Sequence, residues 1–383
     1  MRNIKFVDFS RKYKRYRKQI NSSIERVFKR GWFIGGPERD DFEKSFGQYL
    51  GAKYVIGVNS GTDSISISLK AIGIKFGDEV ITTSHTATPT VSAIRIAGAV
   101  PVFIDIDEDS LNINPSFIEA KITPRTKAIL PAHLYGYPAD MAAIKKIAVK
   151  NKLFLIEDAC QAHGASFNGK KLGTIGNVGC FSFYPTKNLG AFGDAGAIVT
   201  DDKNIAEKAR LIRNFGEESR YKNKIEGINS GMDEIQAAFL NLGVKELDRW
   251  NGERAKIAGI YLRELKNSPL KLPSRGDNIF NRVWHLFVIQ AQRRDGLREF
   301  LKKKGVETLI HYPTPIFKQG AYKFLGYKEK DLPVTTKIHD EILSLPLYPG
   351  LSIPEVKFIC NSIKLFYYKS YGIHGKTIHT RSD

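Results

Sequence analysis

The chain has 383 residues, 42% of them hydrophobic and 26% charged, a composition that is ordinary for a soluble globular protein. This length allows one large domain with a smaller one, or two domains. A net charge of +19 is compatible with a nucleic-acid partner, with an anionic substrate or cofactor, or with a basic solvated surface. Because the basic residues are mostly spread along the chain, we expect no nucleic-acid partner but a basic surface, with a few basic side chains at a diphosphate.

The sequence also argues against several classes of protein and site. No run of about 18 apolar residues is present, so we expect no membrane span. The basic residues near the N-terminus are not followed by an apolar segment, which argues against a secretory signal. The three cysteines form no CxxC pair. We therefore expect no metal site and a location in the reducing cytoplasm.

Strands and helices alternate through the first two thirds of the chain. Residues 1 to about 50 read as two helices with a break at residues 35–37. Short apolar runs then predict strands, with segments of helix length between several of them, for example 139–151. The predicted strands cover 54–58, 79–83, 100–105, 127–134, 153–159, 179–184 and 196–200. This alternation predicts an α/β fold with a mainly parallel sheet that is covered on both faces.

The segment 64–69, SISISL, is ambiguous. Its strict alternation favours a strand by itself. Ser60 is nevertheless a good N-cap, and Ile65, Leu69 and Ile72 fit one face of a helix. A crossover between parallel strands needs a helix at this point. We therefore predict a helix.

The C-terminal third predicts a smaller α+β domain. A long helix over about 232–266 leads out of the first domain, and a strand (283–291), a helix (295–304), another strand (306–310) and terminal helices follow. The predicted division is a large domain over 1–250 and a small domain over 251–371. Residues 372–383 are polar and basic without a pattern, so we expect a disordered tail there.

Three motifs carry residues suited to chemistry. In LFLIEDACQ a buried strand ends in Glu157–Asp158, and α/β sheets bind ligands at such strand ends. A carboxylate there can face a cationic ring nitrogen. The common alternative is an aspartate that caps a helix or forms an ion pair. Lys187 lies in a glycine-rich turn among small and apolar neighbours, which would lower its pKa and make it a nucleophile, although most lysines in loops are simply exposed. NSGTDS, at 59–64, joins a strand to a helix start that can bind a phosphate or can be a plain capped helix.

Taken together in this order and spacing, the motifs resemble the sugar aminotransferases of the DegT/DnrJ/EryC1/StrS group. These belong to the fold type I (aspartate aminotransferase-like) class of pyridoxal-phosphate enzymes. The resemblance covers nearly the whole chain, from FVDFSRKY near the N-terminus to LIHYPTPIF and SLPLYPGLS. It implies a large, mainly parallel sheet domain, a smaller C-terminal α+β domain, and pyridoxal 5'-phosphate as cofactor.

The resemblance also implies roles for individual residues. Lys187 would hold the cofactor as a Schiff base and move a proton, and Asp158 would pair with the pyridine nitrogen. Gln161 would lie beside the ring hydroxyl. Asn229 matches an asparagine that reaches the phosphate from the neighbouring subunit, which implies a homodimer with shared active sites. The other matched positions are Gly61, Thr62 and Ser182 at the phosphate and His311 near the sugar. Tyr184 and His85 are further candidates for binding the substrate.

The sequence departs from the family's pattern at a few positions. The aromatic residue that stacks on the cofactor ring corresponds to Ala87 or, if the alignment is shifted, to His85. An arginine that is common after the Asn-Ser pair is Gly231, and one glycine of the lysine turn is Ala195. Lys187 argues against the dehydrase branch, which has a histidine at that position.

The function implied by the resemblance is transamination of a nucleotide-linked keto-deoxysugar. The expected acceptor is a dTDP-3-keto-6-deoxyhexose, the donor L-glutamate and the product a dTDP-3-amino-3,6-dideoxyhexose. The nearest alternative is a 4-aminotransferase that acts on a UDP-, GDP- or dTDP-4-keto sugar. More distant alternatives are a non-catalytic regulator with the same fold and an enzyme that uses the cofactor for elimination.

Overall fold

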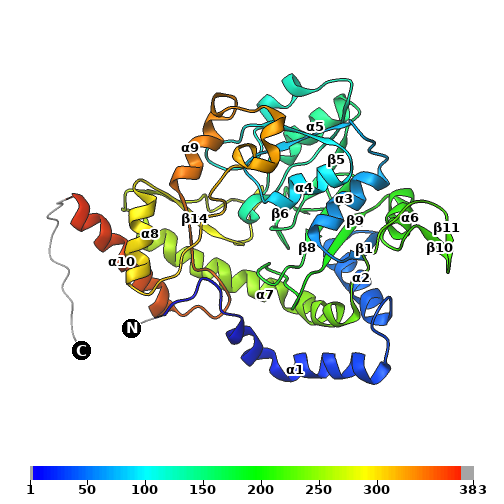
Figure 1. Cartoon of the computed structure of the whole chain (residues 1–383). Coiled ribbons are helices and arrows are strands. Elements are labelled where there is room, and N and C mark those ends of the chain that lie inside the picture. The colour runs from blue at the N-terminus through cyan, green and yellow to red at the C-terminus, as the bar shows by residue number, and fades with distance from the viewer. Residues whose placement is uncertain (1–2, 372–383) are drawn as a thin grey trace.

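The structure is a computed structural model that describes residues 3–371. The tail expected at 372–383 therefore lies outside the described residues. Within residues 3–371, no helix is long and apolar enough to cross a membrane. The elements are arranged around one large sheet (Figure 1).

The large sheet has seven strands in the order β1-β9-β8-β5-β4-β2-β3. Only β9 runs antiparallel to its neighbours β1 and β8, while the remaining pairs are parallel. The mainly parallel sheet predicted from the sequence is thus confirmed. Its strands are β1 (Tyr54–Val58), β2 (Glu79–Thr83), β3 (Val100–Ile104), β4 (Thr126–Ile129), β5 (Phe154–Asp158), β8 (Val178–Ser182) and β9 (Gly196–Thr200).

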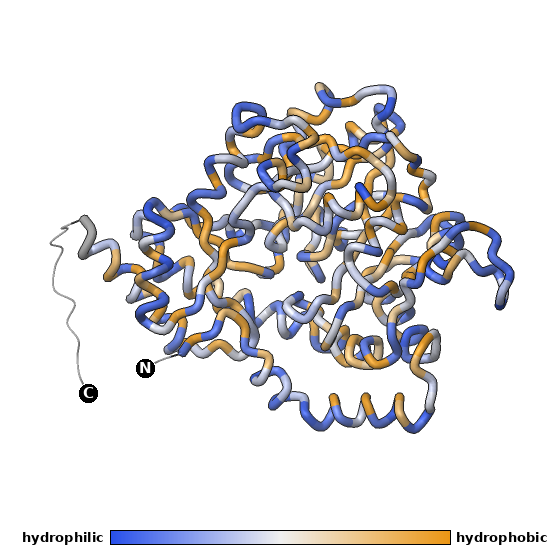
Figure 2. Tube along the Cα trace, in the orientation of Figure 1, coloured by the Kyte–Doolittle hydropathy of each residue, from blue (hydrophilic) through white to orange (hydrophobic). Residues whose placement is uncertain are grey.

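Helices cover both faces of this sheet. Consecutive strand residues point to opposite faces, and both sets are buried and apolar, so each face packs against helices. Leu155 of β5 belongs to an apolar cluster with residues of α2, α5 and α7, whereas its neighbour Ile156 belongs to a second cluster with residues of α3, α4 and α6. Orange, hydrophobic segments accordingly gather inside the molecule (Figure 2). The helices of this part are α1 (Phe9–Arg30), α2 (Pro37–Leu50), α3 (Gly61–Ala71), α4 (Thr88–Ile96), α5 (Met141–Lys150), α6 (Lys203–Ile212) and α7 (Glu234–Leu265).

The ambiguous segment 64–69 lies within α3, so the predicted helix is confirmed. Ser60 caps it by accepting a hydrogen bond from the Asp63 N–H at 3.1 Å. The hydroxyls of Ser64 and Ser68 donate back to helix carbonyl oxygens at 2.7 and 2.6 Å. The helix can therefore bury its serines, and the alternation of serine and apolar residues in 64–69 does not indicate a strand.

The C-terminal part packs around the second half of α7. A second apolar cluster joins α7 to α8 (Arg294–Lys303), α10 (Ile353–Tyr371) and a three-stranded sheet of β12 (Leu270–Lys271), β14 (Phe287–Ala291) and β15 (Ile342–Leu345). Ile4, near the N-terminus, belongs to the same cluster. The domain boundary at residue 250 stays a prediction.

The strand predicted at 306–310 is wrong. Val306 bridges Ile4 and Leu309 bridges Ser344, each as an isolated pair. Because the two ends of the segment pair with different partners, no continuous ladder forms. The strand of this region is β15, whose apolar run the sequence reading did not single out.

The remaining elements are short. They are α9 (Pro333–Glu341), the strands β6 (Ser166–Phe167), β7 (Lys170–Lys171), β10 (Glu217–Ser219), β11 (Lys222–Asn223) and β13 (Phe280–Asn281), and 3₁₀ turns at Pro115–Phe117, Glu119–Lys121, Leu134–Gly136, Ile316–Lys318, Gly320–Leu325 and Glu329–Asp331.

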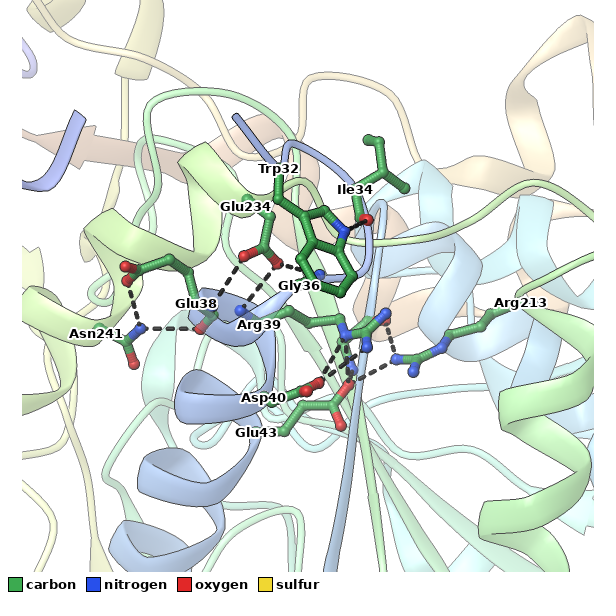
Figure 3. A network of polar contacts seen from close by, with 11 residues as sticks. Trp32, Ile34, Gly36, Glu38, Arg39, Asp40, Glu43, Arg213, Glu234 and Asn241 are labelled. Carbon is green, nitrogen blue, oxygen red and sulfur yellow. Dashed lines mark hydrogen bonds and ion pairs between the residues drawn. The ribbon is translucent and has the colours of Figure 1, made fainter. Parts of the chain in front are cut away.

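A polar network ties α2 to α7 (Figure 3). Glu234, at the start of α7, is fully buried and accepts hydrogen bonds from the backbone N–H groups of Gly36, Glu38 and Arg39 at 2.9, 2.9 and 3.2 Å. Its carboxylate thus satisfies the free donors at the start of α2, where no side chain of α2's own N-cap does so. A Cβ at Gly36 would lie 2.7 Å from this carboxylate, which explains the glycine.

Candidate active site

A cavity of about 350 Å³ opens where the parallel strands of the large sheet end. Most of its lining comes from residues that end or follow β2, β4, β5 and β8 and from the first turn of α3, and His285, His311 and Tyr312 complete it from the C-terminal part. The carboxyl ends of parallel strands meet at one edge of a sheet, where such folds bind ligands. The predicted site residues that line it are Gly61, Thr62, Asp158, Gln161, Ser182, Tyr184, Lys187 and His311.

Asp158 is the last residue of β5, and its side chain is fixed from two sides. Thr90 donates its hydroxyl to Oδ2 at 2.7 Å, and the Cys160 N–H donates to Oδ1 at 3.1 Å. Thr86 lies within hydrogen-bond distance of Thr90, at 3.0 Å between the two hydroxyl oxygens. These contacts aim a buried carboxylate into the cavity, as a partner for a cationic ring nitrogen requires.

Lys187 lies in the turn between β8 and β9, and its backbone N–H donates to the Tyr184 carbonyl oxygen at 2.8 Å. The turn is tight, since a Cβ at Gly190 would lie 2.4 Å from the Pro185 carbonyl oxygen. From α1, Lys12 donates its ammonium group to the Gly190 carbonyl oxygen at 2.9 Å. The N-terminal helix therefore helps to hold the turn that carries the lysine.

Burial lowers the pKa of Lys187, while Cys160 and Asp158 act in the opposite direction. A lowered pKa raises the fraction of Lys187 that is a neutral amine near neutral pH. The neutral form is the one that acts as a nucleophile and accepts a proton. The depressed pKa expected from the sequence is therefore present in the fold.

The first turn of α3 forms a cradle beside Ser182. A helix start has backbone N–H groups without intrahelical partners and a favourable dipole for an anion. A Cβ at Gly61 would lie 2.5 Å from the Ser182 Cβ, so only glycine lets the start of α3 approach Ser182 this closely. The amides of Gly61 and Thr62 and the hydroxyls of Thr62 and Ser182 can together bind a phosphate.

Gln161 and His311 are held by neighbours that also shape the cavity. The Gln161 Oε1 accepts from the Tyr135 N–H at 2.8 Å, and its Nε2 donates to the Tyr312 hydroxyl at 3.1 Å. His311 Nδ1 lies 2.9 Å from the Ser344 hydroxyl oxygen. Burial lowers the pKa of His311 to about 4, so its ring is neutral at physiological pH.

Two predicted site residues do not line the cavity. His85 is 1% exposed, and its ring nitrogens lie 3.0 Å from His339 Nε2 and 3.1 Å from the Tyr135 hydroxyl. The His85 ring is therefore enclosed by protein and does not line the cavity, and a ligand contact of His85 stays a prediction. Ala87 does line the cavity, so the position of the missing aromatic is occupied by a small side chain.

Asn229 is the second predicted site residue that does not line the cavity of its own chain. It is exposed and bridges Asn214, near the β10–β11 hairpin. A contribution from Asn229 to the neighbouring subunit's site stays a prediction.

The sequence reading missed several lining residues. Thr90, His133, His285 and Tyr312 belong to the cavity but were not predicted. Tyr312 follows His311 in the LIHYPTPIF motif, and His285 lies within the predicted strand 283–291. Thr90 has no local sequence signal, because its role depends on where α4 meets the end of β5.

Comparison with known proteins agrees with this geometry. The model of the DegT/DnrJ/EryC1/StrS aminotransferase family matches residues 14–364. A dTDP-3-amino-3,6-dideoxy-alpha-D-galactopyranose transaminase of Aneurinibacillus thermoaerophilus is 44% identical over 95% of this chain and 100% of its own. A dTDP-3-amino-3,4,6-trideoxy-alpha-D-glucose transaminase of Streptomyces venezuelae is 41% identical over 94% of this chain and 95% of its own. The crystal structure of S. venezuelae DesV in complex with a ketimine intermediate superposes with a TM-score of 0.93 at 40% identity, covering 96% of this chain and 99% of that one.

Proposed function

The chain belongs to the DegT/DnrJ/EryC1/StrS aminotransferase family, and from this premise we propose that it aminates the keto carbon of a dTDP-3-keto-6-deoxyhexose. The amino donor is L-glutamate, the cofactor pyridoxal 5'-phosphate and the product a dTDP-3-amino-3,6-dideoxyhexose. Near full-length identity to two transaminases named for 3-amino dTDP sugars supports the substrate class. The observation that carries the chemistry is that Lys187, Asp158 and an anion cradle share one cavity.

The residues fit pyridoxal phosphate in three respects. The cradle of Gly61, Thr62 and Ser182 suits its phosphate, because the start of α3 offers free backbone N–H groups beside the hydroxyls of Thr62 and Ser182 in the same cavity. The carboxylate of Asp158 suits its ring nitrogen, and Lys187 Nζ suits its carbonyl carbon. When bound, the cofactor supplies an electron sink for cleavage of a bond at the amino-bearing carbon.

The chain's own residues then have separable tasks. Lys187, with its lowered pKa, accepts and returns a proton at Nζ. Asp158 keeps a proton on the ring nitrogen by presenting a carboxylate that Thr90 and the Cys160 amide hold in place. Gln161, fixed by Tyr135 and Tyr312, orients the ring hydroxyl. The neutral His311 and Tyr184, which both line the cavity, contact the sugar.

We also propose that the enzyme is a homodimer with shared active sites. Four large apolar residues near the end of α1 and the start of α2 are exposed, namely Phe28, Trp32, Phe33 and Ile34, at 59, 54, 42 and 62%. Such a cluster on the surface of a monomer is typical of an interface. A partner at this surface would also give Asn229 a second chain to contact. The three free cysteines suit the reducing cytoplasm, where we place the reaction.

Product analysis tests the proposed substrate. The purified enzyme is incubated with pyridoxal phosphate, L-glutamate and either a dTDP-3-keto- or a dTDP-4-keto-6-deoxyhexose, and the aminated carbon is identified by NMR. We expect an amino group at C3. Amination at C4 would overturn the assignment of the acceptor, and release of ammonia without an amino sugar would indicate elimination.

A further inference from the structure

Tyr135 does not line the active-site cavity, yet it bonds to two residues that do. It lies in the turn Leu134–Gly136, which follows β4, and it is 4% exposed. Its backbone N–H donates to Gln161 Oε1 at 2.8 Å, and its hydroxyl donates to the His311 carbonyl oxygen. Tyr135 therefore links the residue assigned to the cofactor's ring hydroxyl with a residue assigned to the sugar.

The backbone of Tyr135 is held in an unusual conformation. Its φ is 57°, in the left-handed region that bulky side chains rarely adopt. Its carbonyl oxygen accepts hydrogen bonds from Arg282 Nη2 and from the His285 N–H, both at 3.3 Å. Such a conformation persists where the surrounding contacts determine it, and residues of this kind gather at functional sites. The fold thus fixes where the Tyr135 side chain points.

The hydrogen bonds around the Tyr135 hydroxyl have one direction. The His311 carbonyl oxygen can only accept, so the hydroxyl donates to it and its own oxygen can accept. His85 Nε2 lies 3.1 Å from that oxygen and therefore carries the hydrogen. Burial and the neighbouring His339 lower the pKa of His85 well below its usual value, so the ring is neutral and its Nδ1 accepts from His339 Nε2, 3.0 Å away. A directed chain of hydrogen bonds thus runs from α9 to the backbone of His311.

The anchored carbonyl group belongs to the peptide that joins His311 to Tyr312, and both of these side chains line the cavity. Other contacts hold the side chains themselves. His311 Nδ1 lies 2.9 Å from the Ser344 hydroxyl oxygen, and the Tyr312 hydroxyl accepts from Gln161 Nε2 at 3.1 Å. The Tyr135 hydroxyl instead holds the backbone, so it restricts where both side chains can lie.

We propose that Tyr135, braced by His85, is a positioning residue that holds the peptide between His311 and Tyr312 so that the His311 ring faces the sugar. The proposal deepens the proposed function and rests on it for the contact of His311 with the sugar. His85 then acts on the substrate through Tyr135. A displaced His311 weakens binding of the sugar but leaves the L-glutamate half-reaction, which involves no sugar, nearly unchanged.

The test compares Tyr135→Phe, which removes only the hydroxyl, with Tyr16→Phe as the matched control. Tyr16 is also 4% exposed, and its hydroxyl likewise donates once, to Glu246, and accepts once, from Trp250 Nε1, but it does not line the active-site cavity. In the enzyme loaded with pyridoxal phosphate, we expect Tyr135→Phe to raise the KM for the sugar nucleotide about three- to tenfold, as loss of one hydrogen bond implies. The rate of the L-glutamate half-reaction should stay within about twofold of wild type, and Tyr16→Phe should change neither quantity.

A double variant shows whether the effect passes through His311. If Tyr135 acts by placing this ring, Tyr135→Phe raises the sugar KM much less in a His311→Ala background than in the wild type. Equal effects in the two backgrounds would overturn the proposal. An unchanged sugar KM in a folded Tyr135→Phe variant would do the same, and so would a slowed L-glutamate half-reaction without a change in sugar KM.

Amide hydrogen exchange tests the contact without any turnover. In the full-length, cofactor-free chain, peptides that span 309–316 should exchange faster in Tyr135→Phe than in wild type or Tyr16→Phe, because the backbone has lost its anchor. Unchanged exchange refutes the contact. Faster exchange with an unchanged sugar KM overturns the proposal through the role of His311. A wild-type chain that aminates no dTDP-keto sugar refutes the proposed function instead, and amide exchange still decides whether the contact exists.

If Tyr135→Phe does not fold, two variants of His85 decide. His85→Gln keeps a donor for the Tyr135 oxygen and should retain the wild-type KM for the sugar nucleotide. His85→Leu removes that donor and should raise this KM about threefold. Equal sugar KM values in the two folded variants would contradict the proposal.

Discussion

Replacing Asp158 by asparagine should leave the fold intact and slow turnover by about two to four orders of magnitude. The amide keeps Oδ1 as acceptor for the Cys160 N–H, while Nδ2 replaces Oδ2 next to Thr90. The Thr90 hydroxyl can then accept from Nδ2 and donate to the Thr86 hydroxyl oxygen, 3.0 Å away. No buried group is left unpaired, so we expect a change in unfolding free energy below ~1 kcal/mol.

The kinetic cost follows from the lost charge. Removing one partner of a buried charge pair costs about 3–5 kcal/mol, and each 1.36 kcal/mol of barrier is about a factor of ten in rate. The assay is stopped-flow absorbance of the L-glutamate half-reaction, with thermal unfolding to verify the fold. Asp202→Asn is the matched control, because Asp202 only caps α6 and asparagine caps equally well. Turnover of Asp158→Asn within tenfold of wild type would refute the role of the carboxylate.

Two further predictions concern stability. Glu234→Gln places an amide NH₂ against one of the N–H groups at the start of α2. We expect the free energy of unfolding, measured by urea denaturation, to fall by about 2–3 kcal/mol. A loss below ~0.5 kcal/mol would contradict the capping role. The Arg11 guanidinium lowers the pKa of Glu355 from 4.5 to about 2, so this pair stabilises the fold above pH 4.5 and loses its effect as the pH falls towards 2. Glu355→Gln should therefore lower the free energy of unfolding by about 1–2 kcal/mol at pH 7, allowing for the partial exposure of the pair. The difference in unfolding free energy between variant and wild type should shrink on acidification. A constant difference between pH 7 and 3 would refute the linkage.

Local chemistry explains what could be predicted from the sequence. The positions of Asp158 and Lys187 follow from strand ends and a glycine-rich turn, both of which are set by neighbouring residues. The helix at 64–69 followed from its N-cap and from the need for a crossover, despite an alternation typical of a strand. These features depend on contacts close in the sequence or on the connection of parallel strands.

Long-range contacts explain what could not be predicted. His85 follows a strand end as a ligand-binding residue would, but α9 brings His339 against its ring and encloses it. The region 306–310 is apolar enough for a strand, yet its two ends pair with segments far apart in the sequence. His285 lines the cavity with its ring held by Asn188, about a hundred residues earlier in the chain.

The most direct test of the proposed chemistry is an absorption spectrum of the purified protein with pyridoxal phosphate, before and after L-glutamate is added. We predict a visible band of lysine-bound cofactor that falls on addition of L-glutamate, returns when a dTDP-3-keto-6-deoxyhexose is supplied, and is absent in a folded Lys187→Ala variant. A wild-type chain without this band, or a Lys187→Ala variant that retains it, would contradict the assignment of Lys187 and with it the proposed function.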